Sequence, residues 1–527
     1  MLAKVKSGTL RGVDAYLVEV EVDLSPGLPA FTTVGLPETA VKESKDRVRA
    51  ALKNSGYKFP GNRITINLAP ADVRKEGTGF DLPVAVGILA AQGIVAQDHL
   101  DKFLVFGELS LDGNLKATRG VLSMALATRQ AGLSLIIPRE NAREAGVVQG
   151  IEIYAIDHLG QLVEFLEGRE NLSPFSPSSL EDFNSESEGE LDFQDVKGQE
   201  PVKRALLLAA AGGHNVLMIG APGSGKTMLA QRLPGILPPL GFEEALETSK
   251  IYSVVGLLKP GQGLLTQRPF RSPHHTISDA GLIGGGTTPR PGEVSLAHNG
   301  VLFLDELPEF KRSTLEVLRQ PMEDGVVTIS RAATSLTYPA KFIMVASMNP
   351  CFCGQYGDSR RVCSCTPQQI KNYRSRISGP LLDRIDIQMQ VVAVPFQDLS
   401  EESGGSGSKE MRAQVLGARR IQEKRFARTR IFANAQMTPR LIKEFCTLGV
   451  ESRRLLEAAV ERFGLSARGY SRILKIARTI ADLEGLADLA LPHVAEAIQY
   501  RTLDRQLTSE KGAMFMKEVS QPYATRG

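Results

Sequence analysis

Hydrophobic and polar residues alternate near the start of the chain, and this alternation predicts β-strands. Residues 15–22 (Ala-Tyr-Leu-Val-Glu-Val-Glu-Val) follow the period of two that turns one face of a strand toward a core. Segments 39–56 and 77–95 are predicted to be helices, and the second is strongly apolar. We therefore expect residues 1–168 to form an α/β domain.

Short apolar runs characterise the middle of the chain. Residues 215–219, 300–304 and 341–346 are each bounded by turn-forming or acidic residues, a pattern typical of buried strands in a parallel sheet. They predict an α/β domain over 192–398. Helical periodicity then recurs in 411–430, 439–448, 453–463, 470–483 and 491–503, which predicts a helical lid over 409–507.

Three segments are poor in apolar residues. Residues 169–191 are rich in Ser, Glu, Pro and Asn, and residues 399–408 contain Ser-Gly-Gly-Ser-Gly-Ser. Such segments cannot bury enough apolar surface to become ordered, so we expect a flexible linker and a hinge there. Residues 508–527 are expected to form a loosely held tail.

Composition sets limits on the class of protein. A chain of 527 residues is long enough for about three or four domains. No apolar stretch has membrane-spanning length and no secretory signal is evident, so we expect a cytoplasmic protein without a membrane partner. The net charge of +3 is too small to indicate nucleic-acid binding, which would have to rest on local patches.

A glycine-rich loop follows the first of the apolar runs. The order strand, glycine loop, helix start is the order that a nucleotide-phosphate cradle requires, with backbone N–H groups, a lysine charge and a hydroxyl for Mg²⁺. The residues assigned to binding of ATP and Mg²⁺ are Gly220, Ala221, Pro222, Gly223, Ser224, Gly225, Lys226, Thr227 and Met228.

Polar residues end the other two apolar runs. Asp305 and Glu306 follow 300–304, so Asp305 is predicted to hold the Mg²⁺ shell and Glu306 to polarise the attacking water. The alternative is a solvated acidic turn. Asn349 follows the third run and is predicted to sense the γ-phosphate, whereas the alternative is a turn-forming Asn before Pro350.

The chain resembles an AAA+ ATPase of the branch that includes MCM helicases and magnesium chelatase. It has the same succession of a glycine loop, a strand that ends in acidic residues, a strand that ends in Asn and a helical lid. Four segments sharpen the match, namely 192–200 (Asp-Phe-Gln-Asp-Val-Lys-Gly-Gln-Glu), 271–276 (Arg-Ser-Pro-His-His-Thr), 292–306 and 379–386 (Gly-Pro-Leu-Leu-Asp-Arg-Ile-Asp). With them, nearly the whole chain resembles the ComM (YifB) family. The resemblance implies a homo-hexameric motor that drives branch migration of single-stranded and branched DNA in recombination and natural transformation, together with other recombination proteins.

The resemblance also implies roles for two arginines. Arg384 would be the arginine finger that reaches a neighbouring subunit's γ-phosphate, unless it only pairs with Asp383 or Asp386. Arg468 would be the nucleotide-sensing arginine of the lid, with Arg472 as the competing choice.

The first domain resembles the Lon-protease-like fold. By this resemblance, Asp81 stands where such enzymes place the nucleophilic Ser, and Leu122 stands at the expected Lys position. Since neither an attacking hydroxyl nor its amine base is present, we expect an inactive domain with a scaffolding, ring-forming or DNA-contacting role.

Four of the five cysteines cluster directly after Asn349. In a reducing compartment a cluster of thiols favours metal, and four thiolates suit tetrahedral Zn²⁺, although Cys-x-Cys is less usual than Cys-x-x-Cys. Reduced, unligated thiols are the alternative. The predicted structural zinc ligands are Cys351, Cys353, Cys363 and Cys365.

Local signals for DNA are weaker than those for ATP. Residues 326–338 are predicted to form a hairpin with Arg331 near its tip, where it would contact the phosphate backbone, although a solvated Arg is the alternative. The basic run 419–430 is interpreted as a solvated helix face, and the His274–His275 pair is given a loop or pore role.

Two other functions compete with the DNA motor. One is a chelatase-type ATPase that remodels a protein partner, and the other is an ATP-dependent protease or unfoldase. The missing Ser and Lys oppose a protease. By family resemblance, the chelatase motor subunit lacks both the Lon-like domain and the cysteine loop, so both features favour the DNA motor.

Overall fold

The computed structural model describes residues 1–176, 191–259, 261–286, 288–331, 335–357, 361–394, 406–429 and 431–503. The expected linker and hinge lie largely outside these residues, and the expected tail lies wholly outside them. The described chain divides into two compact units, which are treated separately. Unit 1 comprises residues 1–186, 241–266 and 330–338, and unit 2 comprises 187–240, 267–329 and 339–527.

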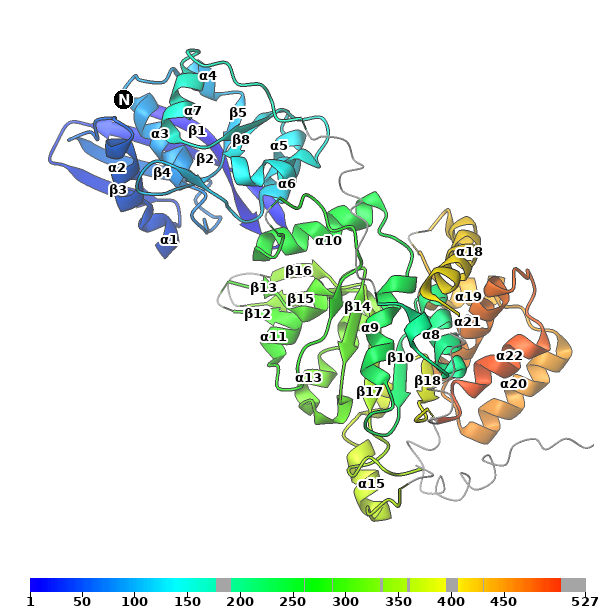
Figure 1. The fold of residues 1–527 in the computed structure, drawn as a ribbon. Helices are drawn as coiled ribbons and strands as arrows, with labels where there is room; N and C mark the ends of the chain where they lie inside the picture. The colour runs from blue at the N-terminus through cyan, green and yellow to red at the C-terminus, as the bar shows by residue number, and fades with distance from the viewer. Residues whose placement is uncertain are drawn as a thin grey trace, which may run out of the picture. The chain divides into compact units, whose positions relative to one another are not determined.

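Unit 1 is built on a seven-stranded sheet in the order β3-β4-β2-β1-β5-β8-β9 (Figure 1). Its strands are β1 (Leu2–Arg11), β2 (Asp14–Ser25), β3 (Ala30–Val34), β4 (Arg63–Ala69), β5 (Phe103–Val105), β8 (Ser134–Pro138) and β9 (Ile153–Ile156), with a small hairpin of β6 (Glu108–Leu109) and β7 (Leu115–Lys116). The alternation at 15–22 correctly predicts β2, which pairs antiparallel with β1 from Arg11↔Asp14 to Leu2↔Asp23.

Helices cover this sheet, and the apolar segment 77–95 provides the most buried of them. Its observed helix α3 packs on β1 and β2, and each of its residues is buried. The segment 39–56 forms two helices rather than one. The helices of unit 1 are α1 (Thr39–Lys42), α2 (Ser44–Asn54), α3 (Asp81–Ala91), α4 (Gln97–Leu100), α5 (Val121–Gln130), α6 (Ala142–Gly146), α7 (Leu159–Leu166) and α10 (Phe242–Val255), with the 3₁₀ turn η1 (Arg139–Asn141).

Helix α10 belongs to unit 1 although it follows the glycine loop in sequence. Its Ser253 hydroxyl donates to the buried carboxylate of Glu144, which also accepts the Leu122 N–H at 3.0 Å. The Ser253 carbonyl accepts the Gly120 N–H at 3.1 Å. These buried polar contacts fix α10 against α5, because each group would be costly to leave without a partner.

Unit 2 contains a parallel five-stranded sheet in the order β11-β14-β17-β10-β18, which confirms the predicted parallel-sheet α/β fold. The three apolar runs become its central strands. Its strands are β10 (Val216–Ile219), β11 (Phe270–Arg271), β14 (Val301–Leu304), β17 (Ile343–Met348) and β18 (Ile387–Gln390), and β12 (Gly284–Gly285) pairs with β13 (Arg290–Pro291).

Helices α8 and α9 pack together beside the sheet, and the lid helices pack on them (Figure 1). The helices of the sheet domain are α8 (Glu200–Gly212), α9 (Lys226–Ile236), α11 (Asp279–Ile283), α12 (Glu293–Leu296), α13 (Arg312–Glu316), α14 (Arg319–Asp324), α15 (Pro367–Arg374) and α16 (Gly379–Leu382), with the 3₁₀ turns η3 (Phe193–Asp195) and η4 (Leu307–Glu309). The lid comprises α18 (Ser408–Phe426), η5 (Asn434–Gln436), α19 (Pro439–Phe445), α20 (Val450–Phe463), α21 (Ala467–Leu483) and α22 (Leu491–Gln499). All five helical segments predicted there are confirmed.

A further hairpin of β15 (Val326–Ser330) and β16 (Ser335–Pro339) forms its own two-stranded sheet, as predicted. Among the described residues, every helix is too short or too polar to cross a lipid bilayer.

Candidate functional site

The glycine loop joins β10 to the N-terminus of α9. Gly223 and Gly225 adopt left-handed backbone angles (φ 77° and 88°), which a side chain would strain, and α9 begins at Lys226. Parallel packing puts the ends of β14 and β17 at the same sheet edge as this loop. The loop therefore presents a helix N-terminus at the edge where the polar residues gather.

Lys226 is buried and its ammonium group is held by the loop itself. Its Nζ donates to the carbonyls of Gly220 at 2.7 Å and Ala221 at 2.9 Å, and it lies 3.4 Å from Oδ1 of Asn349. Burial lowers the pKa of Lys226, while Asp305 and Glu306 oppose that shift. The predicted lysine and the predicted sensor asparagine are thus brought together.

Asp305 accepts three hydrogen bonds at the end of β14. The donors are the Thr227 hydroxyl to Oδ2 at 2.9 Å, the Ser347 hydroxyl to Oδ1, and the Glu306 N–H to Oδ1 at 3.0 Å. Two oxygen ligands of an octahedral Mg²⁺ lie about 2.9 Å apart, since Mg–O distances are about 2.0–2.1 Å. The Thr227 and Asp305 oxygens therefore have a spacing that fits Mg²⁺.

Glu306 projects from a strained position. Its backbone is left-handed (φ 53°), which is uncommon for a residue with a side chain, and its carboxylate is more than half exposed. His275 Nδ1 lies 3.6 Å from Oε2 of Glu306, and its ring stacks obliquely on that of His274 with centroids 4.1 Å apart. The histidine pair thus lies beside the proposed water-polarising carboxylate.

Arg384 and Arg468 share one carboxylate. Oε1 of Glu323 lies 2.6 Å from Nη2 of Arg384 and 3.3 Å from Nη2 of Arg468. The hydrogen bond from Arg384 lowers the pKa of Glu323. Arg384 is 4% exposed, and Arg468 is 58% exposed. The sequence suggested Asp383 or Asp386 as the ion-pair partner of Arg384. In the structure that partner is Glu323 of α14.

Arg472, the competing lid arginine, has a different partner. Its Nη1 contacts Oδ1 of the buried Asp386 and donates to the Arg384 carbonyl at 3.0 Å. Asp386 also accepts the Asn215 N–H at 3.0 Å and lies 3.6 Å from His214. Arg472 therefore joins the lid to the segment that leads into β18, and Arg468 is the more exposed of the two arginines.

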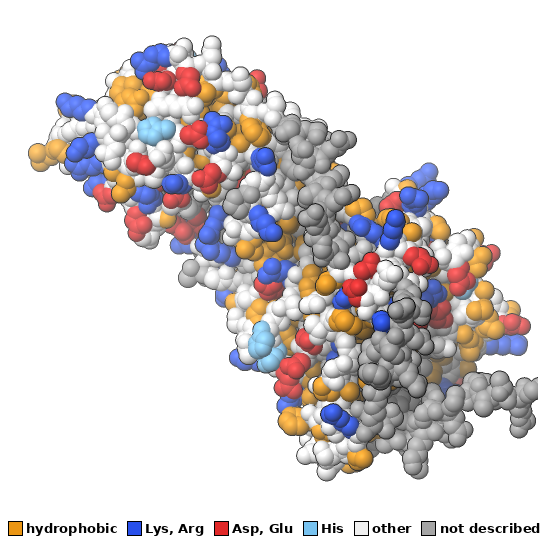
Figure 2. All heavy atoms as spheres, in the orientation of Figure 1, with side chains coloured by type: hydrophobic (Ala, Val, Ile, Leu, Met, Phe, Trp, Pro, Cys, Tyr) orange, Lys and Arg blue, Asp and Glu red, His pale blue; other side chains and the backbone are white. Residues whose placement is uncertain are grey.

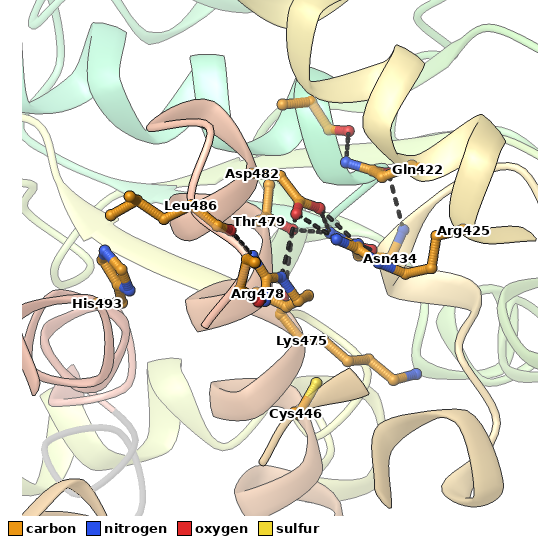
Figure 3. A network of polar contacts seen from close by, with 12 residues as sticks. Gln422, Arg425, Asn434, Cys446, Lys475, Arg478, Thr479, Asp482, Leu486 and His493 are labelled. Atoms are coloured by element: carbon orange, nitrogen blue, oxygen red, sulfur yellow. Dashed lines mark hydrogen bonds and ion pairs between the residues drawn. The ribbon is translucent and has the colours of Figure 1, made fainter. Parts of the chain in front are cut away.

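The basic run 419–430 is not simply a solvated helix face, as the sequence interpretation proposed. Arg425 donates to both carboxylate oxygens of Asp482 (Figure 3). Arg419 donates to the Ala210 carbonyl at 2.9 Å. Arg425 is only 10% exposed. These two arginines hold α18 in place, because carboxylate and carbonyl acceptors lie on the helices packed against it.

The four clustered cysteines come together as the zinc prediction requires. Their sulfur atoms all lie within 4.8 Å of one another, and three of the pairs lie 3.4–3.6 Å apart. Tetrahedral Zn–S bonds of about 2.3 Å would place sulfurs about 3.8 Å apart. The donor set and its spacing therefore fit Zn²⁺. Cys446, the fifth cysteine, is buried in the lid, which raises the pKa of its thiol to about 12.

Arg331 is exposed and directly follows β15, while residues 332–334 at the tip lie outside the described residues. On the face drawn in Figure 2, Lys and Arg side chains lie among Asp and Glu side chains rather than in one block. Among its described residues, this face therefore shows no block of positive charge of the kind that a DNA interface would need.

Asp81 forms an ion pair in the first domain. Its carboxylate accepts Arg47 Nε at 2.6 Å and Nη2 at 2.9 Å. Burial raises the pKa of Asp81 to about 6, although Arg47 opposes the shift. Leu122 is buried and contributes its N–H to Glu144. Neither position holds a hydroxyl nucleophile or an amine.

Two residues beside the site, Ser347 and Glu323, were given no role from sequence, and His275 was given a loop or pore role rather than a place beside Glu306. Ser347 was detectable, because β14 and β17 are parallel neighbours and the residue after Leu304 must lie near the residue after Ala346. Glu323 lies 61 residues before Arg384, and no local pattern connects them.

Three protein-family models match the chain. Residues 192–399 match "Magnesium chelatase, subunit ChlI", residues 20–141 match "Subunit ChlI of Mg-chelatase", and residues 405–501 match "Magnesium chelatase, subunit ChlI C-terminal". The chelatase description thus extends to the N-terminal domain. A magnesium-chelatase 38 kDa subunit itself matches only 57% of this chain while using 84% of its own length, so the expected difference in the N-terminal domain stays a prediction.

Similar proteins match over nearly their full length. An uncharacterized protein YifB of Salmonella typhimurium is 46% identical over 96% of this chain and 98% of its own length. Competence protein ComM of Haemophilus influenzae is also 46% identical, with the same coverage of both chains. The magnesium-chelatase 38 kDa subunit of Rhodobacter capsulatus is 26% identical over 57% of this chain and 84% of its own length.

Proposed function

Since the chain belongs to the ComM and YifB family of magnesium chelatase-like AAA+ proteins, we propose that it is an ATP-dependent DNA motor. In this proposal a cytoplasmic homo-hexamer drives branch migration and promotes integration of single-stranded DNA during natural transformation. Similarity over 98% of a protein named for competence supports the transformation role. The observation that carries the motor is the Thr227–Asp305 contact beside Lys226 and Asn349.

ATP binds at the glycine loop in this proposal. Backbone N–H groups of residues 220–228 and the Lys226 ammonium group hold the phosphates, for which Lys226 leaves the Gly220 and Ala221 carbonyls. Mg²⁺ at Thr227 and Asp305 supplies neutralisation of the phosphate charge. Glu306 orients the attacking water, and Asn349 senses the γ-phosphate.

Hydrolysis is proposed to require a second subunit. Arg384 is proposed to be the arginine finger and Arg468 the nucleotide-sensing arginine of the lid, and both lie beside the carboxylate of Glu323. An arginine from the next subunit stabilises the charge that develops in phosphoryl transfer. Glu323 occupies both guanidinium groups until they engage the nucleotide.

DNA contact is assigned to Arg331, because it is exposed at the end of a hairpin strand. A single guanidinium group on the phosphate backbone gives salt-dependent, sequence-tolerant binding. The N-terminal domain is proposed to be proteolytically inactive, since Asp81 and Leu122 supply neither a hydroxyl nucleophile nor its base. The four-cysteine cluster is proposed to hold structural Zn²⁺.

A chelatase-type ATPase that remodels a protein partner is the second candidate. The descriptions of all three matching family models favour it. The two candidates differ in the ligand that stimulates hydrolysis, because only the DNA motor couples hydrolysis to DNA.

The test is the ATPase rate as a function of protein concentration, with and without single-stranded and branched DNA. The DNA motor predicts a steep concentration dependence, strong stimulation by DNA, and loss of both in Lys226→Ala. Measurable hydrolysis that DNA leaves unchanged would reject the motor and favour the remodelling ATPase. A branch-migration assay on a synthetic four-way junction then tests the finer assignment.

A further inference from the structure

The cysteine loop, described over residues 351–357 and 361–365, touches the proposed nucleotide site at Gly354. Gly354 lies so close to the glycine loop that a Cβ added to it would be 2.6 Å from Cδ of Pro222 and 4.0 Å from Cγ of Asn349. Real Cβ atoms do not approach other atoms to 2.6 Å, so the two loops are packed as tightly as a glycine permits. Any displacement of Gly354 toward Pro222 must move the glycine loop.

The position of the cysteine loop is set at its start by the proposed metal ligands. Cys351 is fully buried and follows Asn349 by two residues. The Gly354 N–H donates to the Cys351 carbonyl at 3.0 Å, and the Tyr356 N–H donates to Cys351 Sγ at 3.4 Å. The backbone that carries Gly354 is therefore folded around a cysteine sulfur.

Helix α15 supports the same segment from the other side. Arg374 Nε donates to the Pro350 carbonyl at 3.1 Å, and its guanidinium group lies 5.2 Å from the ring centroid of Tyr356. Figure 1 shows α15 beyond the end of β17, next to the loop that leaves that strand. Asn349, Pro350 and Gly354 are thus held between the sulfur cluster and α15.

We propose that Zn²⁺ bound by the four cysteines positions Pro222 and Asn349, so that nucleotide binding depends on the metal. This inference rests on the proposed nucleotide site and adds its control by a divalent metal ion. Without the metal, four thiols only 3.4–4.8 Å apart lose the ion that links Cys351 and Cys353 to Cys363 and Cys365. Gly354 and Asn349 then lose the anchor on which their positions depend.

Two perturbations separate the metal from the contact that it supports. Gly354→Ala leaves all four cysteines in place but puts a methyl group against Pro222. Gly485→Ala is the matched control, because its left-handed backbone (φ 71° against 78° for Gly354) suffers similar strain and a Cβ there meets nothing within 4 Å. Zinc removal from the wild-type chain with a chelator, followed by zinc readdition, perturbs the metal without a substitution.

The measurements are zinc content per chain and the Kd of a fluorescent ATP analogue with Mg²⁺, on the full-length protein. We expect one zinc in the wild type, Gly354→Ala and Gly485→Ala. Gly354→Ala and zinc-free wild type should both raise Kd at least tenfold, and readdition of zinc should restore the wild type alone. Gly485→Ala should bind as the wild type does.

Unchanged Kd after zinc removal, or wild-type Kd in a zinc-loaded Gly354→Ala, would overturn the inference while leaving the nucleotide site intact. A wild-type protein that contains no zinc would overturn it as well. If the wild type and Lys226→Ala both fail to bind the analogue, the proposed function itself fails.

Discussion

Substitution of Asp482 by Asn should loosen the lid, because this carboxylate neutralises two buried arginines. It accepts Arg425 at 2.7 and 2.5 Å, Asn434 Nδ2 at 2.8 Å and Arg478 Nε at 3.1 Å (Figure 3). Arg425 is 10% exposed and Arg478 is 2% exposed. These hydrogen bonds join α18, η5 and α21, and Asp482 is the acceptor in each of them.

The expected cost follows from this geometry. Removing one partner of a buried ion pair costs about 3–5 kcal/mol, because the remaining charge is left uncompensated. We take about 3 kcal/mol, at the low end of that range, since Arg425 retains some contact with water and the substituted amide would keep one acceptor oxygen. That free energy corresponds to roughly a hundredfold increase in the equilibrium constant for local opening.

Hydrogen exchange followed by mass spectrometry on the full chain measures this opening. Slow amides of α18 and α21 should exchange roughly a hundredfold faster in Asp482→Asn, whereas those of α3 in unit 1 should not change. Asp488→Asn is the control, because Asp488 is exposed in the same lid. A change of less than threefold in α18 and α21 would refute the view that this carboxylate holds the lid together.

Three further predictions concern other charged groups. Glu323→Gln removes the carboxylate that competes for the proposed arginine finger, Arg384. The protein concentration for half-maximal ATPase should therefore fall about fivefold, whereas Glu316→Gln should leave it unchanged. An equal fall in both variants would contradict the competition. Arg331→Ala should weaken single-stranded DNA binding similarly for all sequences and reduce the slope of log K against log salt by about 0.7. A fluorescence-anisotropy titration at several salt concentrations measures both effects. An unchanged slope would exclude Arg331 from the DNA interface. Burial alone would raise the pKa of Asp386, but Arg472 and His214 hold it below its ordinary value. The stability that Asp386 contributes is therefore present above about pH 4 and is lost as the pH falls further, so urea denaturation should show the wild type's advantage over Asp386→Asn shrinking below about pH 4; a constant advantage would contradict this.

Sequence was sufficient for features that depend on neighbouring positions along the chain. Apolar runs located β10, β14 and β17, and the residue after each run reached the same sheet edge because the strands are parallel. The four cysteines likewise converge from one short loop.

Features that depend on distant pairing were not accessible in the same way. The basic spacing around Arg425 is that of a solvated helix, and only the packing of α21 brings Asp482 to it. Arg384 lies between two aspartates in sequence, yet its side chain reaches Glu323. The composition of residues 241–266 does not show that they belong to unit 1 rather than to the sheet domain, because that depends on which helices α10 packs against.

The placement of α10 has a consequence for dissecting the molecule. The backbone passes from one unit to the other at five points, the boundaries being 186/187, 240/241, 266/267, 329/330 and 338/339. A fragment beginning after residue 186 would retain α10 but lose Glu144 and α5, leaving the Ser253 hydroxyl without its acceptor. An N-terminal domain taken from a relative would therefore have to fit α10, although α10 lies in the sequence between the glycine loop and β14.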